Sequence, residues 1–290
     1  MIIPTSKVKI NVEYFPSPEK ETTIVFLLHG FTGSANDWLE IIPNLKKKFS
    51  YVAVDLIGHG QSNAPNELEH YKTPSMIALL DEILKHLTKE RFILIGYSMG
   101  GRAALSYAAQ YPDKLSGLIL ESTSAGIADE KLREERRLHD EKIVEIIEKK
   151  PIEEFFKFWM NQDLFTSLHS IPEEKLLKAK AAKLENNKLG LINSLRGFGT
   201  GVMPPLHEHL NSIKCKTLLI TGELDYKFSK INQELTKRII NSHHEIVKDS
   251  GHIVHFEKPD KFVELVNGFL GEFSPSEGIK ITPLPSSPAH

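Results

Sequence analysis

The sequence has a single cysteine among its 290 residues, Cys215, so the chain cannot form an internal disulfide bond. Cys215 lies just before a strand-like run, and we expect a small buried apolar group there rather than a reactive thiol. The formal net charge is only -2, which leaves no basic excess for binding nucleic acid or an anionic membrane. No apolar run approaches the length of a membrane span, and the first residues lack the layout of a signal peptide. We therefore expect a cytoplasmic protein with no stable membrane association and no nucleic-acid partner, and nothing in the sequence specifies an oligomeric state.

The sequence does contain a regular alternation of patterns. Strand-like apolar runs alternate with helix-like patterns from about residue 7 to residue 122, and one helical pattern covers 73–87 between two strands. Such alternation predicts the α/β class, with a mainly parallel sheet and helices on both of its faces. The composition, with 40% hydrophobic and 26% charged residues, is typical of a globular chain.

The alternation stops between residue 129 and about residue 195, where the sequence is charged and helix-periodic. Four helices are predicted in this region, over 130–148, 152–161, 173–183 and 188–196. We therefore expect a helical cap inserted into one core, with the core over 1–124, the cap over 125–205 and the core again over 206–273. A last helix is expected from 259 to about 273, and the Pro- and Ser-rich tail, 274–290, is predicted to be disordered.

A serine flanked by glycines marks the junction between a predicted strand and a predicted helix. Residues 96–100 read Gly-Tyr-Ser-Met-Gly, an apolar run over 92–95 precedes them, and a helical pattern follows from residue 102. Gly-x-Ser-x-Gly alone is a weak pattern, because glycine and serine are common residues. In this context it predicts a nucleophile elbow, in which small neighbours let the backbones approach closely and leave the hydroxyl of Ser98 exposed.

Two further residues complete a Ser, Asp, His order along the chain. Asp225 follows the β-rich run 216–221, and His252 follows the predicted strand 243–247. This order is the one expected of α/β-hydrolases, so we predict the α/β-hydrolase fold. His252 would take the proton of Ser98, and the carboxylate of Asp225 would set the imidazole tautomer and stabilise its charged form. Asp225 could instead be a simple turn residue, with Asp249 as the rival carboxylate, and both alternatives stay open.

The loop after the apolar run 24–28 is a candidate for part of an oxyanion hole. Its sequence, His-Gly-Phe-Thr-Gly over 29–33, matches the loop that supplies one amide to such a hole. The predicted donors are the backbone N–H groups of Phe31 and Met99. We expect His29 to be a structural hydrogen-bonding residue, since the triad needs no second base.

Arginine is unevenly distributed along the sequence. Five of the seven arginines fall just after the elbow or in the predicted cap: Arg102, Arg133, Arg136, Arg137 and Arg196. A guanidinium binds carboxylates in bidentate geometry and stays charged when partly desolvated, so this distribution suggests a small anionic substrate with more than one carboxylate. Arg133, Arg136 and Arg137 also stand at spacings suited to exposed salt bridges along a helix. Among the aromatic residues of the cap, Trp159 and Phe165 are predicted to be pocket walls.

Several of these segments resemble a single family. Two are specific, Gly-Tyr-Ser-Met-Gly-Gly-Arg over 96–102 and Ser-Leu-Arg-Gly-Phe-Gly-Thr-Gly over 194–201. Others are shared more widely across the superfamily, at 28–34 with Trp38, 120–122 and 222–228. From about residue 22 to residue 270 the chain resembles the 2-succinyl-6-hydroxy-2,4-cyclohexadiene-1-carboxylate synthases of menaquinone biosynthesis. The sequence departs from the family's pattern at 203–207, which read Met-Pro-Pro-Leu-His, and in its extra tail.

The resemblance implies a lyase rather than a hydrolase. In this family the triad serine acts as a base on a ring carbon next to a succinyl ketone, and pyruvate leaves from an enolpyruvyl ether without the use of water. By matching positions, Arg102, Arg136 and Arg196 are implied to bind substrate carboxylates, with Trp159 near the substrate. No metal and no organic cofactor is implied, and His252 and His255 alone do not make a metal site.

Two other functions stay open at this point. A serine hydrolase acting on esters or C–C bonds would use the same triad, because a fold and a triad do not define a reaction. A non-catalytic ligand receptor on this fold would have no need of the triad. The arginine distribution and the Ser-Leu-Arg segment favour the lyase.

Overall fold

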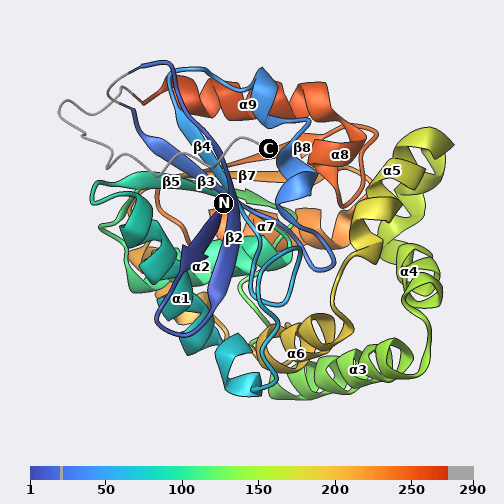
Figure 1. The fold of residues 1–290 in the computed structure, drawn as a ribbon. Helices are drawn as coiled ribbons and strands as arrows, with labels where there is room; N and C mark the ends of the chain where they lie inside the picture. Colours follow the sequence, from blue (N-terminus) through green and yellow to red (C-terminus); the bar gives the residue numbers. More distant parts are fainter. Residues whose placement is uncertain (20–21, 274–290) are drawn as a thin grey trace, which may run out of the picture.

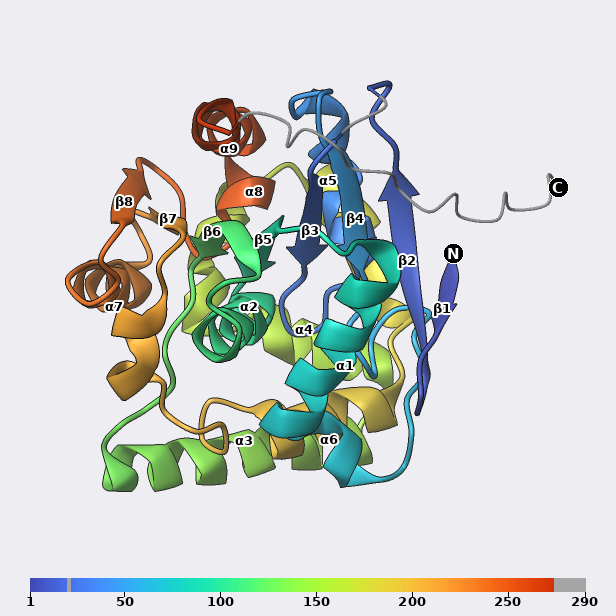
Figure 2. The ribbon, with the colours of Figure 1, turned by 90° about the vertical axis from the view of Figure 1, so that its left-hand side faces the viewer.

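The computed structural model describes residues 1–19 and 22–273, so the predicted tail, 274–290, lies outside the described residues. Eight strands of the described residues form one sheet (Figure 1), and their order, β1-β2-β4-β3-β5-β6-β7-β8, can be followed in Figure 2. Their bounds are β1 Ile2–Pro4, β2 Lys9–Phe15, β3 Ile24–Leu28, β4 Ser50–Val54, β5 Phe92–Tyr97, β6 Leu115–Glu121, β7 Lys216–Gly222 and β8 Ser242–Val247. The β1–β2 and β2–β4 pairs are antiparallel, and the other neighbouring strands are parallel.

The central strands are continuous apolar runs because both of their faces are covered. All residues of β3 are buried, and its bounds coincide with the run 24–28 that the sequence predicted. Along β3 the side chains alternate: Phe26 and Leu28 belong to one hydrophobic cluster, and Val25 and Leu27 to another. A strand that buries both faces shows no polar alternation. The predicted class, a mainly parallel sheet with helices on both faces, is confirmed.

The helices of the core lie in two layers. Figure 2 shows α1, α2 and α7 on one side of the sheet and α8 and α9 on the other. The bounds are α1 Thr73–Leu87, α2 Met99–Gln110, α7 Tyr226–Thr236, α8 Val254–Glu257 and α9 Pro259–Gly271. The predicted helix over 73–87 is confirmed as α1, whereas α9 ends at Gly271, short of the predicted end at about 273.

Four further helices lie between β6 and β7 and gather on one side of the core (Figure 1). They are α3 Glu130–Lys149, α4 Ile152–Met160, α5 Glu173–Leu184 and α6 Lys188–Phe198. They lie within the region predicted as a cap and enclose a hydrophobic cluster of their own, which includes Ile143, Phe155, Phe156 and Leu191. We call these helices and the segments between them the cap.

Short 3-10 helices complete the structure: η1 Ala35–Trp38, η2 Ile42–Asn44, η3 Leu68–Tyr71, η4 Asp163–Ser170 and η5 His207–Ser212. The sequence did not predict η4, because a 3-10 helix lacks the 3.6-residue period by which an amphipathic helix is found. Cys215 is buried, as expected. Across the described residues, no helix is both long and apolar enough to cross a membrane. The same residues contain no group of three or more His, Cys, Asp or Glu side chains placed to hold a metal ion.

Candidate active site

Ser98 stands on a strained turn between β5 and α2. Its backbone has φ 49° and ψ −104°, a conformation that a residue with a side chain rarely adopts. A Cβ on Gly96 would lie 2.5 Å from the carbonyl oxygen of Gly100, and a Cβ on Gly100 would collide with the carbonyl oxygen of Leu28. The turn is therefore possible only with glycine on both sides of the serine. The structure thus contains the predicted strand, elbow and helix in that order.

Ser98, His252 and Asp225 form one hydrogen-bonded chain. His252 Nε2 lies 3.1 Å from Ser98 Oγ, and His252 Nδ1 lies 2.6 Å from Asp225 Oδ2. In this geometry Nδ1–H donates to the carboxylate and Nε2 accepts from the serine hydroxyl. His252 and Asp225 are 1% and 7% exposed, so water competes little for these bonds. The arrangement can move the serine proton to the imidazole and stabilise the resulting charge.

The structure brings Asp225, and not its rival Asp249, to the histidine. Asp225 follows β7 and precedes α7, where its Oδ1 also accepts from the amide of Phe228 at 3.3 Å. Asp249 is exposed, has φ 53°, and donates its amide to Glu223 Oε2 at 3.2 Å.

The backbone around His252 is held by a buried carboxylate that the sequence analysis did not single out. Glu257 accepts from the amide of Gly251 at 2.7 Å and from the amide of Ile253 at 3.0 Å. A second buried carboxylate, Glu121, accepts from both the amide and Nδ1 of His255, at 3.0 and 2.7 Å. The available signal for Glu257 was an acidic residue five positions after His252, directly after the mainly apolar segment 253–256.

The loop after β3 lies beside the elbow because Leu28 of β3 pairs with Gly96 of β5. His29 in this loop accepts from the amide of Leu56 through Nε2 at 2.9 Å, and its Nδ1 lies 2.7 Å from the Gly30 carbonyl oxygen. Burial lowers the pKa of His29, which keeps the ring neutral with Nδ1–H as the donor to Gly30. These bonds match the expected structural role of His29.

A cavity of about 530 Å³ lies above the triad, between the core and the cap. Its lining includes nearly all of the residues predicted to belong to the site: Ser98, Asp225, His252, Phe31, Met99, Arg102, Arg136 and Trp159. Such a volume lies within the usual range for a small-molecule site. We call this space the triad cavity.

Two guanidinium groups, those of Arg102 and Arg136, face the triad cavity and lie close enough to repel each other. Arg102 donates from Nη2 to the carbonyl oxygen of Phe198 at 3.1 Å, and its buried Nε has no hydrogen-bond partner among the described residues. Arg136 donates from Nε to Asp140 Oδ1 at 2.8 Å. Burial and, secondarily, repulsion from Arg136 lower the pKa of Arg102 to about 10. A bound anion would offset both the cost of burying the charge of Arg102 and its repulsion from Arg136. This end of the cavity therefore favours anionic ligands.

The side chain of Arg196 does not lie at the triad cavity, where the family resemblance placed it. It lies on α6 but points to α3, where its guanidinium donates to Glu141 at 3.0 Å and to Glu148 at 3.2 Å. It is absent from the lining of the triad cavity. Two carboxylates on the neighbouring helix offer Arg196 closer partners than the cavity does, which the local Ser-Leu-Arg pattern could not reveal.

Lys227 is a cation of the cavity lining that the sequence analysis did not single out. It lies two residues after Asp225, and burial together with the charge of Arg136 lowers its pKa. Its position so soon after the triad carboxylate was the available signal.

Aromatic side chains of the cap close the triad cavity. The ring centroid of Trp159 lies 5.1 Å from that of Phe31 and 5.7 Å from that of Phe165. Phe165 in turn lies 6.2 Å from the ring of His252. Trp159 and Phe165 both line the cavity, as predicted for its walls.

The fold and the site together define a protein of the α/β-hydrolase fold, and the family model described as alpha/beta hydrolase fold matches residues 23–259. A putative 2-succinyl-6-hydroxy-2,4-cyclohexadiene-1-carboxylate synthase from Bacillus subtilis (strain 168) is 41% identical, over 85% of this chain and 89% of that protein. A synthase of the same name from Salmonella paratyphi C (strain RKS4594) is 30% identical, over 88% of this chain and 96% of that protein. The chain belongs to this family of synthases, which confirms the resemblance found in the sequence.

Solved structures agree with this placement. The structure of MenH from S. aureus matches with a TM-score of 0.87 and 33% identity, over 90% of this chain and 98% of that chain. A thermophilic esterase from Thermogutta terrifontis matches with a TM-score of 0.80 and 24% identity, over 94% of this chain and 98% of that chain. The second likeness shows a shared fold alone.

Proposed function

We propose that this protein is a lyase that eliminates pyruvate from 2-succinyl-5-enolpyruvyl-6-hydroxy-3-cyclohexene-1-carboxylate to give 2-succinyl-6-hydroxy-2,4-cyclohexadiene-1-carboxylate. The observation that carries the proposal is the pairing of a Ser-His-Asp chain with two clustered guanidinium groups in a single cavity. A general ester hydrolase needs only the Ser-His-Asp chain. An enzyme that acts on a polycarboxylate needs, in addition, cations that bind the carboxylates of its substrate. The names of the relatives support the same reaction.

In the proposed mechanism, His252 takes the proton of Ser98 so that the serine oxygen can act as a base. The oxygen removes a proton from the ring carbon that bears the succinyl ketone. The electron pair shifts into the ring as its second double bond forms, and the C–O bond to the enolpyruvyl group breaks. The leaving enolate takes the proton held by the imidazolium of His252 and becomes pyruvate, so that the triad returns to its starting state. Water is neither consumed nor released.

Charge develops on the ketone oxygen while the proton leaves. We propose that the amides of Phe31 and Met99 hold this enolate, because donors fixed in a site poor in water stabilise charge without reorganising. Both residues line the triad cavity beside Ser98. Asp225 would keep His252 in the required tautomer and stabilise its charged form.

The substrate's carboxylates would be held by Arg102 and Arg136, with Trp159 against its ring. Lys227 lies near Arg136 and is the third cation of the lining that we assign to this role. Holding the substrate at several carboxylates fixes the reacting carbon relative to Ser98. Arg196 would reach the substrate only by giving up Glu141 and Glu148. A cytoplasmic location is part of the same proposal and rests on the sequence.

The direct test is to supply the enolpyruvyl substrate to purified protein and to follow pyruvate with lactate dehydrogenase and NADH. Stoichiometric pyruvate together with the conjugated diene product supports the lyase. Hydrolysis of neutral aryl esters with no pyruvate release would instead support the esterase. Failure to react with a serine-directed fluorophosphonate, with neither activity present, would favour a non-catalytic receptor.

A further inference from the structure

A second cavity, of about 340 Å³, lies beside the triad cavity and does not include Ser98, Asp225 or His252 in its lining. It is formed where α4, η4 and α5 of the cap meet the core loop that contains Phe31 and the short helix α8, which contains Phe256. We call it the lysine cavity. The lining is mainly apolar, and its aromatic members include Phe31, Tyr97, Phe156, Trp159, Phe165 and Phe256.

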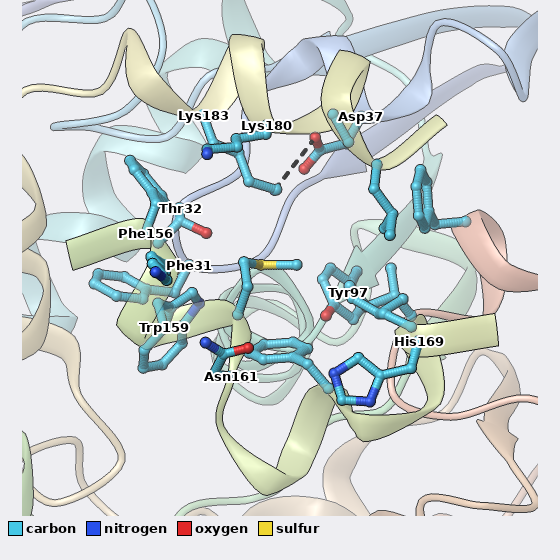
Figure 3. A pocket seen from close by; sticks show the side chains of 18 of the residues that line it. Phe31, Thr32, Asp37, Tyr97, Phe156, Trp159, Asn161, His169, Lys180 and Lys183 are labelled. Atoms are coloured by element: carbon cyan, nitrogen blue, oxygen red, sulfur yellow. Dashed lines mark ion pairs between the residues drawn. The ribbon is translucent and has the colours of Figure 1, made fainter. Parts of the chain in front are cut away.

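Cationic side chains lie at one end of the lysine cavity. Figure 3 shows Lys180, Lys183 and Asp37 grouped there, with the rings of Phe31, Phe156 and Trp159 along the adjoining wall. Lys157, which is exposed like Lys180, also contributes to the lining, so the lining as a whole has three lysines and one aspartate. The end therefore has a positive excess that an anion would balance.

Lys183 is the most confined of these lysines. Its side chain is only 14% exposed, and its Nζ lies 3.8 Å from Asp37 Oδ1, which is beyond hydrogen-bond distance. At that distance the ammonium group of Lys183 keeps its hydrogen-bond donors available to water or to a ligand in the cavity. A carboxylate in the cavity would supply acceptors at the right place.

The two cavities share four aromatic residues of their linings. Phe31, Tyr97, Trp159 and Phe165 line both of them. Phe31 is also the residue whose amide we assign to the oxyanion hole. A molecule in the lysine cavity would therefore contact the same rings that shape the triad cavity.

From these observations the structure assigns the lysine cavity as a second binding site, for a cyclic monocarboxylate of one or two planar rings. The planar rings of the ligand pack against Phe31, Phe156 and Trp159. Its carboxylate lies between Lys180 and Lys183. The assignment concerns binding alone and does not depend on the reaction proposed for the triad cavity.

Isothermal titration calorimetry of the full chain with 1-naphthoate tests the assignment. We expect saturable binding at one site per chain, and much weaker binding of 1-naphthalenemethanol, which has the same rings and no charge. Lys183→Met and Lys180→Met keep the apolar stems and remove the charges, so each is expected to weaken naphthoate binding by about tenfold. Lys178→Met is the matched control, because Lys178 lies on the same helix, α5, but pairs with Glu174 at the surface.

A second control separates the two cavities. Arg102→Ala changes the triad cavity only, so naphthoate affinity should stay within about twofold of wild type. Loss of binding in Arg102→Ala with full binding in both lysine variants would place the ligand in the triad cavity and overturn the assignment. No saturable binding at millimolar naphthoate, or equal affinity for the alcohol, would also overturn it. Because Lys183 also approaches Asp37 of the core, Lys180→Met gives a result that does not depend on that contact.

Discussion

The carboxylate of Glu257 accepts hydrogen bonds from the amides on both sides of His252, so the backbone position of the histidine depends directly on this one side chain. Glu257 does not take part in the Ser98, His252 and Asp225 chain. It is therefore a positioning residue, and its contribution should be visible in turnover more than in substrate binding.

Glu257→Ala is expected to lower kcat about 10- to 100-fold with KM nearly unchanged, because a small displacement of a reacting group is enough for such a loss. Glu257→Gln should lose less, since its amide oxygen can still accept one of the two bonds. The measurement is steady-state pyruvate release, with Glu264→Gln on the exposed side of α9 as the control. A higher KM with unchanged kcat would contradict the positioning role.

Ser98→Ala and His252→Ala should each reduce pyruvate release by roughly 10³-fold or more, and the double variant should lose little beyond that. Residues that act as a unit show such non-additive losses. Single-turnover measurements with enzyme in excess exclude effects of product release. Near wild-type turnover in Ser98→Ala would rule out the serine as the base.

Asp225→Asn should be far more damaging than Asp249→Asn. The first change leaves the 2.6 Å contact to His252 in place but favours the wrong imidazole tautomer, for which a loss on the order of 10⁴ in kcat is expected. The second alters an exposed turn residue. The comparison uses kcat/KM for pyruvate release, and the reverse ranking would show that the carboxylate is misassigned.

Arg102→Ala should cost roughly 2–5 kcal/mol of transition-state stabilisation with the polycarboxylate substrate, because its partner charge would be left unpaired in a site poor in water. Arg102→Lys should recover only part of this, since an ammonium group cannot form the bidentate contact. Any activity on a neutral aryl ester should change much less. Equal losses on both substrates, with unchanged circular dichroism, would leave Arg102 as a structural support of the elbow.

Arg196→Ala and Arg136→Ala should differ clearly. Arg196 is about one-third exposed and paired with Glu141 and Glu148, so its removal should cost less than about 1 kcal/mol in kcat/KM and in the free energy of unfolding. Arg136 lines the triad cavity, and its removal should raise KM strongly. An Arg196→Ala loss as large as that of Arg136→Ala would show that Arg196 leaves its glutamates to bind substrate.

Much of this protein could be predicted from short segments of sequence. The strand 24–28, the helix 73–87 and the glycines around Ser98 follow local rules, because a buried parallel strand, an amphipathic helix and a strained turn each require particular residues at particular spacings. The order of Ser98, Asp225 and His252 along the chain, together with these elements, was enough to predict the α/β-hydrolase fold.

Other features depended on which distant segments pack together. The direction of Arg196 was decided by Glu141 and Glu148 on a neighbouring helix, at separations of 55 and 48 residues along the chain. The grouping of Lys180 and Lys183 with Asp37 likewise required α5 to lie over the core. A charged side chain takes the partners that folding brings within a few ångströms, and a local pattern does not contain that information. The sequence by itself determined the elements and the order of the triad, and the tertiary structure alone decided which charges face each cavity.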